Sequence, residues 1–381
     1  MQPRTEHVGP VLIVEDNPQN QKILKGLCAR QGLATAVADN GRVALDMLSD
    51  GFFAVYIVDL MMPVMDGRAF IGHLKERHPD AVILVQTALD SAGTIIDIMK
   101  LGVFDYIIKP IDIELFQATL RKALEYRRLK DLERDQLQRF RSELTRVREI
   151  QAASMSRSRT PDGFDIAHSM LPAEDLSGDF YDGIRLRDDR TLVMLCDVTG
   201  HGIASSYVGA ELKSLFRSTA ESTASPAEVL RDVNRTITER GRSSHYMNTA
   251  ILCDIGSGGS SVVIASAGHP PGIFYCAASG ECQWVKGGGP LVGFTNQASY
   301  AERPIEMATG DCLLLYTDGL IEAFDEGGCG MYGDERLMRV FADHVHAASR
   351  DIVLAIIDDV YRFTNYSRQH DDITIVCVKK I

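Results

Sequence analysis

The chain has 381 residues, a formal net charge of −12 and a hydrophobic content of 45%. This length predicts two to three domains, each large enough to bury its own core. The acidic balance argues against a protein that relies on a general electrostatic grip on nucleic acid or anionic lipid. We therefore expect proteins and metal ions as partners, with no nucleic acid and no membrane.

The eight cysteines are scattered as single residues, and no pair has the spacing of a metal site. A disulfide framework is therefore not expected, and a reducing compartment is the default. The N-terminal region lacks the apolar core of a signal peptide, and no uninterrupted apolar run approaches the roughly 20 residues that span a bilayer. These features predict a soluble, cytoplasmic protein.

Short apolar runs alternate with amphipathic stretches from about residue 10 to residue 125. This alternation is typical of a doubly wound parallel sheet. The clearest runs, at 11–14, 54–58 and 81–85, are continuously apolar, as strands covered by helices on both faces are. Functional residues in such sheets stand at the carboxyl ends of the strands. The residues at these ends are Glu15, Asp16, Asp59 and Thr87.

These strand-end residues have the composition of a site that accepts a phosphoryl group. A carboxylate that is phosphorylated needs a divalent cation, acidic side chains to hold that cation, and a lysine to meet the remaining charge. Asp59 is the candidate acceptor, and with Glu15 and Asp16 it would hold Mg²⁺. Lys109 would pair with the acyl phosphate, and Thr87 would hydrogen-bond it. Each residue alone also has a structural explanation, such as a helix cap or a loop lysine.

Residues 126–162 form the next segment, in which the pattern stays helical through about Ala153 without glycine or proline. The spacing of a heptad seam is followed by Leu137, Phe140, Leu144 and Val147, while Leu129 and Leu132 belong to a shifted phase. We interpret this segment as a helical linker with a short coiled coil, through which two copies pair as a homodimer. A single amphipathic helix that lies on a neighbouring domain is the alternative.

The remaining residues, 163–381, follow a polar segment and contain several apolar, strand-like runs. Two helices are predicted among them, at about 203–219 and at 226–239 after the cap-like Ser225. Strands that cluster in this way with few intervening helices indicate an α+β sandwich.

Four motifs of this last segment place aspartates at the edges of apolar runs. They are SGDFYD with Asp179 and Asp182, CDVTGHG with Asp197, YTDGL with Asp318, and HDDIT with Asp371 and Asp372. So many carboxylates at one site would repel each other unless cations neutralised them, and their convergence therefore implies metals. Two metals roughly 4 Å apart can clamp a phosphate for in-line attack by water. A turn is the simpler explanation of any single motif, and a structural role is favoured for His201 and His269.

Residues 8–125 resemble the receiver domain of response regulators. The segments VLIVEDN, DLMMPVMDG and DYIIKP, with the pair Thr87-Ala88, match the acid pocket, acceptor loop, lysine loop and switch threonine of that family. The resemblance implies a flavodoxin-like, five-stranded parallel sheet with one bound Mg²⁺. It also implies phosphorylation of Asp59 by a histidine kinase or a phosphotransfer protein, Tyr106 as the aromatic residue that changes rotamer with Thr87, and a cis peptide at Lys109-Pro110.

Residues 163–381 resemble the SpoIIE/RsbU branch of the metal-dependent protein phosphatase 2C family. The matching segments, in the order of the family, are PAEDLSGDFYD, LCDVTGHG, SAGHPP, YTDGLIEA and DDITIVCV. The resemblance implies two Mn²⁺ or Mg²⁺ ions held by Asp179, Asp197, the carbonyl of Val198, Asp318 and Asp371, with Asp372 as a weaker candidate. Two departures are that Ser177 replaces the second glycine of the family's GGD motif, and that the helix carrying EIQAASM lacks the family's Leu-Leu-Pro ending.

Together these features predict a two-component response regulator whose receiver controls a metal-dependent phosphatase. The expected catalytic set is Asp179, Asp197, Asp318 and Asp371. The resemblance implies phosphoserine or phosphothreonine on a protein as substrate, with a phosphorylated anti-sigma factor antagonist as the expected protein. The alternative is a phosphorylation-controlled binding protein, a pseudophosphatase that sequesters its partner. A DNA-binding regulator is disfavoured because no helix-turn-helix pattern follows the linker.

Overall fold

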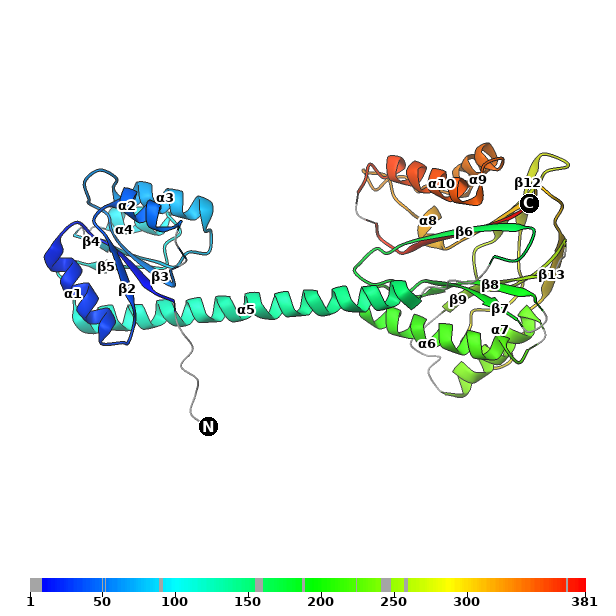
Figure 1. Cartoon of the computed structure of the whole chain (residues 1–381), viewed down its shortest axis with the longest axis horizontal. Coiled ribbons are helices and arrows are strands. Elements are labelled where there is room, and N and C mark those ends of the chain that lie inside the picture. Colours follow the sequence, from blue (N-terminus) through cyan, green and yellow to red (C-terminus); the bar gives the residue numbers. More distant parts are fainter. Residues whose placement is uncertain are drawn as a thin grey trace. The chain divides into compact units, whose positions relative to one another are not determined.

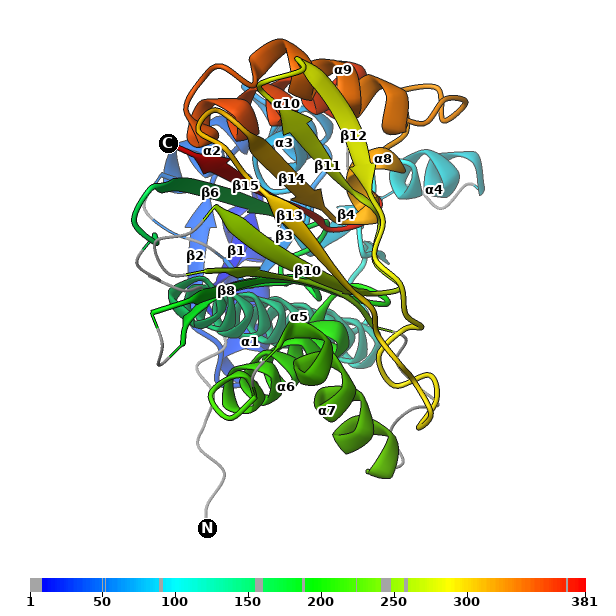
Figure 2. The ribbon, with the colours of Figure 1, turned by 90° about the vertical axis from the view of Figure 1, so that its right-hand side faces the viewer.

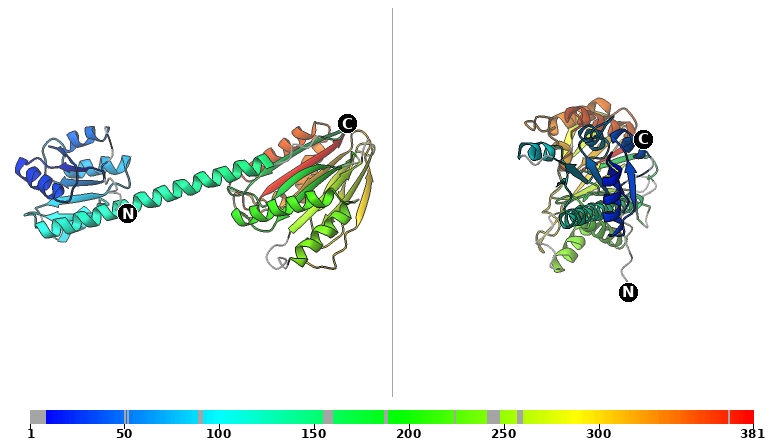
Figure 3. Two further views of the ribbon diagram at one scale, coloured as in Figure 1. Left: turned by 60° about the horizontal axis from the view of Figure 1, so that its bottom comes forward. Right: turned by 90° about the vertical axis from the view of Figure 1, so that its left-hand side faces the viewer.

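The computed structural model describes residues 9–49, 51, 53–88, 92–154, 160–186, 189–223, 225–240, 248–256, 260–367 and 369–381. The chain divides into two compact units, Met1–Arg141 and Ser142–Ile381. One helix, α5 (Ile113–Ser154), crosses this division without a break, and Figures 1 and 3 show it as a single helix. The predicted helical linker is therefore helical through Ser154.

The first unit contains a parallel sheet with the strand order β2-β1-β3-β4-β5. Its strands are β1 (Val11–Val14), β2 (Thr35–Ala38), β3 (Val55–Asp59), β4 (Ile83–Thr87) and β5 (Asp105–Ile108). Its helices are α1 (Pro18–Ala29), α2 (Gly41–Met47), α3 (Gly67–Arg77), α4 (Ala92–Met99) and the beginning of α5. This strand order is that of flavodoxin-like folds, so the predicted five-stranded receiver sheet is confirmed.

Alternate residues of the parallel strands point to opposite faces of the sheet and pack into two separate hydrophobic cores. Leu12 and Val14 pack with residues of α2, α3 and α4, whereas Val11 and Ile13 pack with residues of α1 and α5. Helices therefore cover both faces of the sheet, which explains why β1, β3 and β4 are buried along their whole length.

The second unit contains two antiparallel five-stranded sheets, with the orders β13-β10-β9-β8-β7 and β12-β11-β14-β15-β6. The strands are β6 (Phe164–Leu171), β7 (Phe180–Arg185), β8 (Thr191–Val198), β9 (Asn248–Ile255), β10 (Ser261–Ala267), β11 (Gly272–Cys276), β12 (Glu281–Val285), β13 (Glu302–Glu306), β14 (Cys312–Tyr316) and β15 (Ile373–Lys380). The helices are α6 (Ile203–Ala220), α7 (Pro226–Glu239), α8 (Asp318–Ile321), α9 (Asp334–His344) and α10 (Ser349–Phe363).

The helices and sheets of the second unit form four layers, with a hydrophobic core between each layer and the next. One core lies between the two sheets, one lies between the first sheet and helices α6 and α7, and one lies between the second sheet and helices α9 and α10. Figure 2 shows α6 and α7 below the sheets and α9 and α10 above them. The predicted α+β sandwich is confirmed, and α6 and α7 are the two predicted helices.

Helices α9 and α10 were not among the predicted elements. Their buried residues nevertheless have helical spacing, with Leu337, Val340 and Phe341 in α9 and Ile352, Val353 and Ile356 in α10. Among the helices in the described ranges, none combines the length and the apolar character that a bilayer crossing needs.

Candidate functional site

The acidic pocket of the first unit lies at the carboxyl ends of β1 and β3, as predicted. Glu15, Asp16 and Asp59 each offer one carboxylate oxygen, and these atoms all lie within 4.8 Å of one another. Glu15 and Asp59 are buried, whereas Asp16 is exposed. Carboxylate oxygens at this separation suit a hard cation such as Mg²⁺, so the residues present fit one divalent ion.

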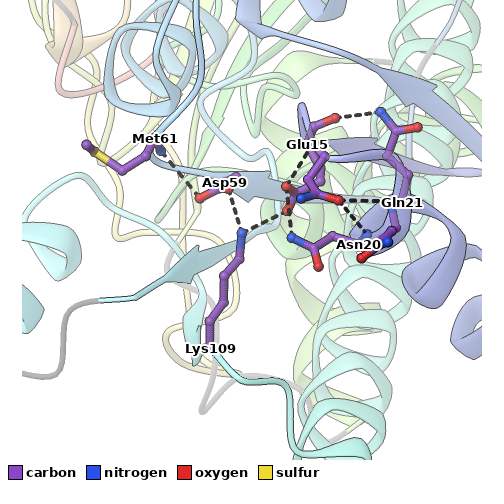
Figure 4. A network of polar contacts seen from close by, with 8 residues as sticks. Glu15, Asn20, Gln21, Asp59, Met61 and Lys109 are labelled. Carbon is purple, nitrogen blue, oxygen red and sulfur yellow. Dashed lines mark hydrogen bonds and ion pairs between the residues drawn. The ribbon is translucent and has the colours of Figure 1, made fainter.

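Lys109 reaches into this pocket from the loop after β5. Its Nζ donates hydrogen bonds to Asp59 Oδ2 at 2.5 Å and to Glu15 Oε2 at 2.9 Å, and Figure 4 shows both contacts. Burial lowers the pKa of Lys109, but the bonds to the two carboxylates outweigh burial, and the pKa lies above its usual value. The predicted cis peptide at Lys109-Pro110 is confirmed.

Backbone and amide groups hold the carboxylates of the pocket in place. Asn20 Nδ2 donates to Glu15 Oε1 at 3.1 Å, and the Met61 N–H donates to Asp59 Oδ1 at 3.3 Å (Figure 4). A side chain at Gly67 would place its Cβ 2.2 Å from the Asp59 carbonyl oxygen. The acceptor loop can therefore close onto α3 only around a glycine.

The two predicted switch residues lie on neighbouring strands. Thr87 is the buried last residue of β4, and Tyr106 is half-buried in β5, where it pairs with Val85. The Lys109 N–H donates to the Thr87 carbonyl at 2.8 Å, so the lysine loop is attached to the end of β4. The structure thus brings the acceptor, the lysine and the threonine to one edge of the sheet.

The acids of the second unit converge because the strands are antiparallel. Asp179 directly precedes β7, and Asp197 is the second-last residue of β8. These strands are neighbours, with Phe180 paired to Cys196. In the other sheet, Asp318 follows β14 and Asp371 precedes β15, with Tyr316 paired to Ile375. Both pairs of strand ends therefore lie at one end of the sandwich.

The electrostatics of this end show how close the acids are. Burial, together with the charges of Asp318 and Asp371, raises the pKa of Asp197 to about 7. Burial and the charge of Asp197 raise the pKa of Asp179 well above its usual value. Burial and the charge of Asp318 also raise the pKa of Asp371. Carboxyl groups whose ionisation is disfavoured by burial and by one another's charges fit a site that divalent cations neutralise.

The second acid set consists of Asp179, Asp197, Asp318 and Asp371. Its ligand atoms lie farther apart than those of Glu15, Asp16 and Asp59. In the ranges that the structure describes, no group of three acidic, histidine or cysteine residues other than the Glu15 trio has its ligand atoms within 4.8 Å of one another. A set that is spread over two sheets suits two ions better than one.

Two buried threonines hold Asp179, and the sequence reasoning missed both. Thr317 Oγ1 donates to Asp179 Oδ2 at 2.9 Å, and Thr374 Oγ1 donates to the same oxygen at 2.7 Å. Both threonines are fully buried. Their signal in the sequence was weak, because each one is a single hydroxyl beside an aspartate motif, in YTDG and in DDIT.

Asp372 lies differently from its neighbour Asp371. Its Oδ1 accepts from the Ala173 N–H at 2.8 Å, and its Oδ2 accepts from Ser177 Oγ at 2.8 Å and from the Gly178 N–H at 2.7 Å. These bonds engage both oxygens of a buried carboxylate. The geometry therefore favours Asp372 as a residue that orders the loop before Asp179, and not as a metal ligand.

The predicted carbonyl of Val198 lies beside this loop. A side chain at Gly178 would place its Cβ 2.9 Å from the Val198 oxygen and 3.1 Å from the Gly200 oxygen. At Gly319 a Cβ would lie 2.2 Å from the Asp372 carbonyl oxygen. The four motifs can therefore approach one another only because positions 178 and 319 are glycines, which have no side chain.

Three other residues of the motifs lie outside the acid set. Asp182 is fully buried and accepts bonds of 2.7 to 3.1 Å from Arg217 on α6. His201 lies 3.0 Å from Glu174, and His269 is buried with its Nδ1 2.6 Å from Thr249 Oγ1. The structural role that the sequence favours for each histidine stays a prediction.

We expect the metal-free second unit to be less stable at about pH 8 than at about pH 6. The Asp197 carboxyl titrates near pH 3.9 in an unfolded chain and at about 7 in the fold. Its stabilising contribution is therefore complete below the unfolded pKa and is lost as the pH rises through the folded pKa. The urea midpoint, measured in a chelator through fluorescence of the single tryptophan, Trp284, would show this. Asp197→Asn should flatten the dependence, and a higher midpoint at the higher pH would contradict it.

Comparison with known proteins gives a match for each unit. The model of Stage II sporulation protein E (SpoIIE) matches residues 187–380, and the model of the response regulator receiver domain matches residues 11–121. The receiver region is similar to the transcriptional regulatory protein ZraR of Escherichia coli O157:H7, with 36% identity over 123 residues, which are 32% of this chain and 28% of the relative.

The second unit is similar to the phosphoserine phosphatase RsbU of Bacillus subtilis, with 24% identity over 219 residues, 58% of this chain and 64% of the relative. The chain thus spans less than two thirds of the length of either curated relative. The solved SiaA-PP2C domain of Pseudomonas aeruginosa shares the fold, with a TM-score of 0.57 and 20% identity over 64% of this chain and 98% of that domain. The architecture is a receiver domain joined by α5 to a domain of this fold.

Proposed function

Because this chain belongs to the Stage II sporulation protein E (SpoIIE) family and carries a receiver domain before the matched segment, we propose that it is a response regulator with a metal-dependent phosphatase as its output. The observation that carries the proposal is the convergence of Asp179, Asp197, Asp318 and Asp371 at one end of the sandwich. Its substrate would be phosphoserine or phosphothreonine on a protein.

The four aspartates would together bind two Mn²⁺ or Mg²⁺ ions. Asp179, Asp197 and the Val198 carbonyl stand on one sheet, and Asp318 and Asp371 stand on the other. When bound, such ions supply an activated water and neutralise the charge of the phosphate. The chain itself orients the ligands: Thr317 and Thr374 both donate to Oδ2 of Asp179 and so fix the orientation of this carboxylate.

The receiver would accept a phosphoryl group from a histidine kinase or a phosphotransfer protein. An oxygen of Asp59 attacks the phosphorus of a phosphohistidine, the P–N bond breaks as the P–O bond forms, and the histidine leaves with a proton. Glu15, Asp16 and Asp59 would hold Mg²⁺, and Lys109 would meet the charge of the acyl phosphate. Thr87 would then hydrogen-bond the phosphate, and Tyr106 would change its rotamer together with Thr87.

The substrate protein is proposed from the chemistry of relatives. RsbU bears the name phosphoserine phosphatase, which supports phosphoserine as the substrate group. The family resemblance points to a phosphorylated anti-sigma factor antagonist. Release of inorganic phosphate from such a protein, dependent on Mn²⁺ and abolished by a chelator, would test the proposal, and no release under any divalent cation would refute it.

We also propose that residues 126–162 link a receiver at 8–125 to a phosphatase domain at 163–381 and pair two copies. Leu137, Phe140 and Val147 of the predicted seam are 48%, 51% and 45% exposed. Three apolar side chains exposed at heptad spacing support pairing with a second helix. We expect sedimentation at micromolar concentration to show a dimer and Phe140→Glu to shift it toward monomer. A monomeric wild type would refute the pairing.

A further inference from the structure

A cavity of the second unit adjoins the acid set. It has a volume of about 140 Å³ and lies between α8, the end of α10 and the segment that precedes β15. Its lining includes Glu322, Phe324, Tyr361, Gln369, His370 and Asp371. Because Asp371 belongs both to this lining and to the proposed metal ligands, a phosphate that the ions hold would lie next to the cavity.

The aromatic walls of the cavity are held by neighbouring rings. Phe324 and His370 contact each other edge to face, with their ring centroids 5.8 Å apart. On the side of α10, the ring of Tyr361 stacks on that of Tyr366, with centroids 5.8 Å apart and an angle of 8° between the planes. The fold therefore provides two fixed aromatic surfaces beside the acid set.

Glu322 gives the cavity its negative charge. Partial burial and the charges of Asp318 and Asp371 raise the pKa of Glu322, so this carboxylate lies close to both aspartates. In the part of the chain that the structure describes, no cation or hydrogen-bond donor engages the Glu322 carboxylate, and the lining contains no lysine or arginine. Ions held by Asp318 and Asp371 would neutralise those two groups and leave the charge of Glu322 unpaired. The cavity thus favours a cationic group over an anionic one.

The space and the walls suit a long cationic side chain. One water needs only roughly 10–15 Å³ of such space, so the cavity has room for an extended side chain. Lysine and arginine pack their aliphatic stems on apolar surface, and aromatic rings attract their charged groups. The buried Nε2 of Gln369 finds no hydrogen-bond partner among the described residues, and it is thus available to donate to a carbonyl oxygen of a bound peptide segment.

We propose that this cavity receives a lysine or arginine side chain of the substrate protein and that Glu322 pairs with its charge. The cationic residue stands within three positions of the phosphorylated one, because three extended residues span about 10 Å. Glu322 is thus a specificity-determining residue that does not touch the reacting atoms. The inference rests on the proposed function, since it names the substrate chemistry of the same site.

The test uses the full chain with Mn²⁺ and short alanine-based peptides that carry a central phosphoserine. Each of the three positions on either side of the phosphoserine carries in turn a lysine or the uncharged norleucine, and phosphate release gives kcat/KM. At one position we expect kcat/KM to be about fivefold higher for lysine than for norleucine, as a partly exposed ion pair provides. The difference should lie in KM, because the reaction does not change the group that Glu322 binds.

Three variants show whether Glu322 causes this preference. In Glu322→Gln the ratio of kcat/KM for the lysine peptide to that for the norleucine peptide should fall to about one. In Glu322→Lys the preference should reverse, so that glutamate at the same peptide position is favoured over norleucine. The matched control is Glu281→Gln, which removes an exposed carboxylate from β12 and should keep the ratio of the wild type.

Equal kcat/KM for lysine and norleucine at every position, or a preference that persists in Glu322→Gln, would overturn the inference. Hydrolysis of p-nitrophenyl phosphate without hydrolysis of any peptide would also overturn it, because a subsite this close to the phosphate must act on a short peptide. If the wild type hydrolyses neither kind of substrate under any divalent cation, the proposed function fails instead.

Discussion

Asp197→Ala is expected to lower kcat/KM for hydrolysis of a phosphoserine protein by at least about 100-fold, which corresponds to about 2.7 kcal/mol of transition-state stabilisation. Asp197 lies between the two pairs of strand ends, since Asp318 and Asp371 raise its pKa and Asp179 hydrogen-bonds it. Its loss removes a carboxylate that lies close to acids of both sheets. Initial rates of phosphate release at saturating Mn²⁺, for the wild type and the variant, would measure the effect.

The matched control is Asp343→Ala, which removes an exposed carboxylate from α9, far along the chain from the acid motifs. It should retain the wild-type rate. Activity within about fivefold of the wild type in Asp197→Ala, a loss of only ~1 kcal/mol, would contradict the assignment of the metal site. A wild type that binds its phosphorylated partner without releasing phosphate under Mn²⁺ would instead favour the pseudophosphatase alternative.

Asp59→Asn is expected to abolish the response of the phosphatase to beryllofluoride and Mg²⁺, a stable substitute for the phosphoryl group. Coupling of 1 to 3 kcal/mol is typical of two-state switches, so we expect the wild-type rate to change by about fivefold or more. Asp59 offers the oxygen that would bond beryllium, and Lys109 already lies 2.5 Å from it. The asparagine keeps the shape of the side chain but removes the charge that the site requires.

The same assay separates the receiver from the phosphatase metals. Fluoride that acts directly on the metal ions of the second unit would change the rate of Asp59→Asn as much as that of the wild type. Asp46→Asn, an exposed substitution on α2, should respond like the wild type. A full response in Asp59→Asn would therefore refute the proposed coupling. A response in the wild type and in Asp46→Asn, but not in Asp59→Asn, would support it.

Much of the receiver could be predicted because its information is local. Continuous apolar runs identify strands that are buried on both faces, and parallel strands must all end at the same edge of the sheet. The positions of Glu15, Asp59 and Thr87 at strand ends therefore determined which residues meet. The structure adds which oxygen of Asp59 each partner takes, with Met61 on Oδ1 and Lys109 on Oδ2.

The phosphatase acids were harder to assign, because neighbouring aspartates of one motif can have different roles. Successive side chains of an extended segment point to opposite sides, so only one residue of the pair Asp371 and Asp372 can face the acid set directly. Asp182 comes three positions after Asp179, an odd offset that puts the two side chains on opposite sides, and Asp182 accepts hydrogen bonds from Arg217 instead. Which member of each pair faces the site depends on register, and register is set by the partner strand.

The sequence by itself determined that this chain carries two sets of carboxylates at strand ends, and it indicated the fold of each unit. Only the tertiary structure decided that α5 contacts the loop before Asp179, where Gln151 Nε2 donates to the Ser177 carbonyl oxygen. Hydrogen bonds between a helix and a distant loop leave no periodic pattern in the sequence, because they depend on how the helix packs. The same packing places Thr317 and Thr374 on Asp179 and sets Asp372 apart from its neighbour.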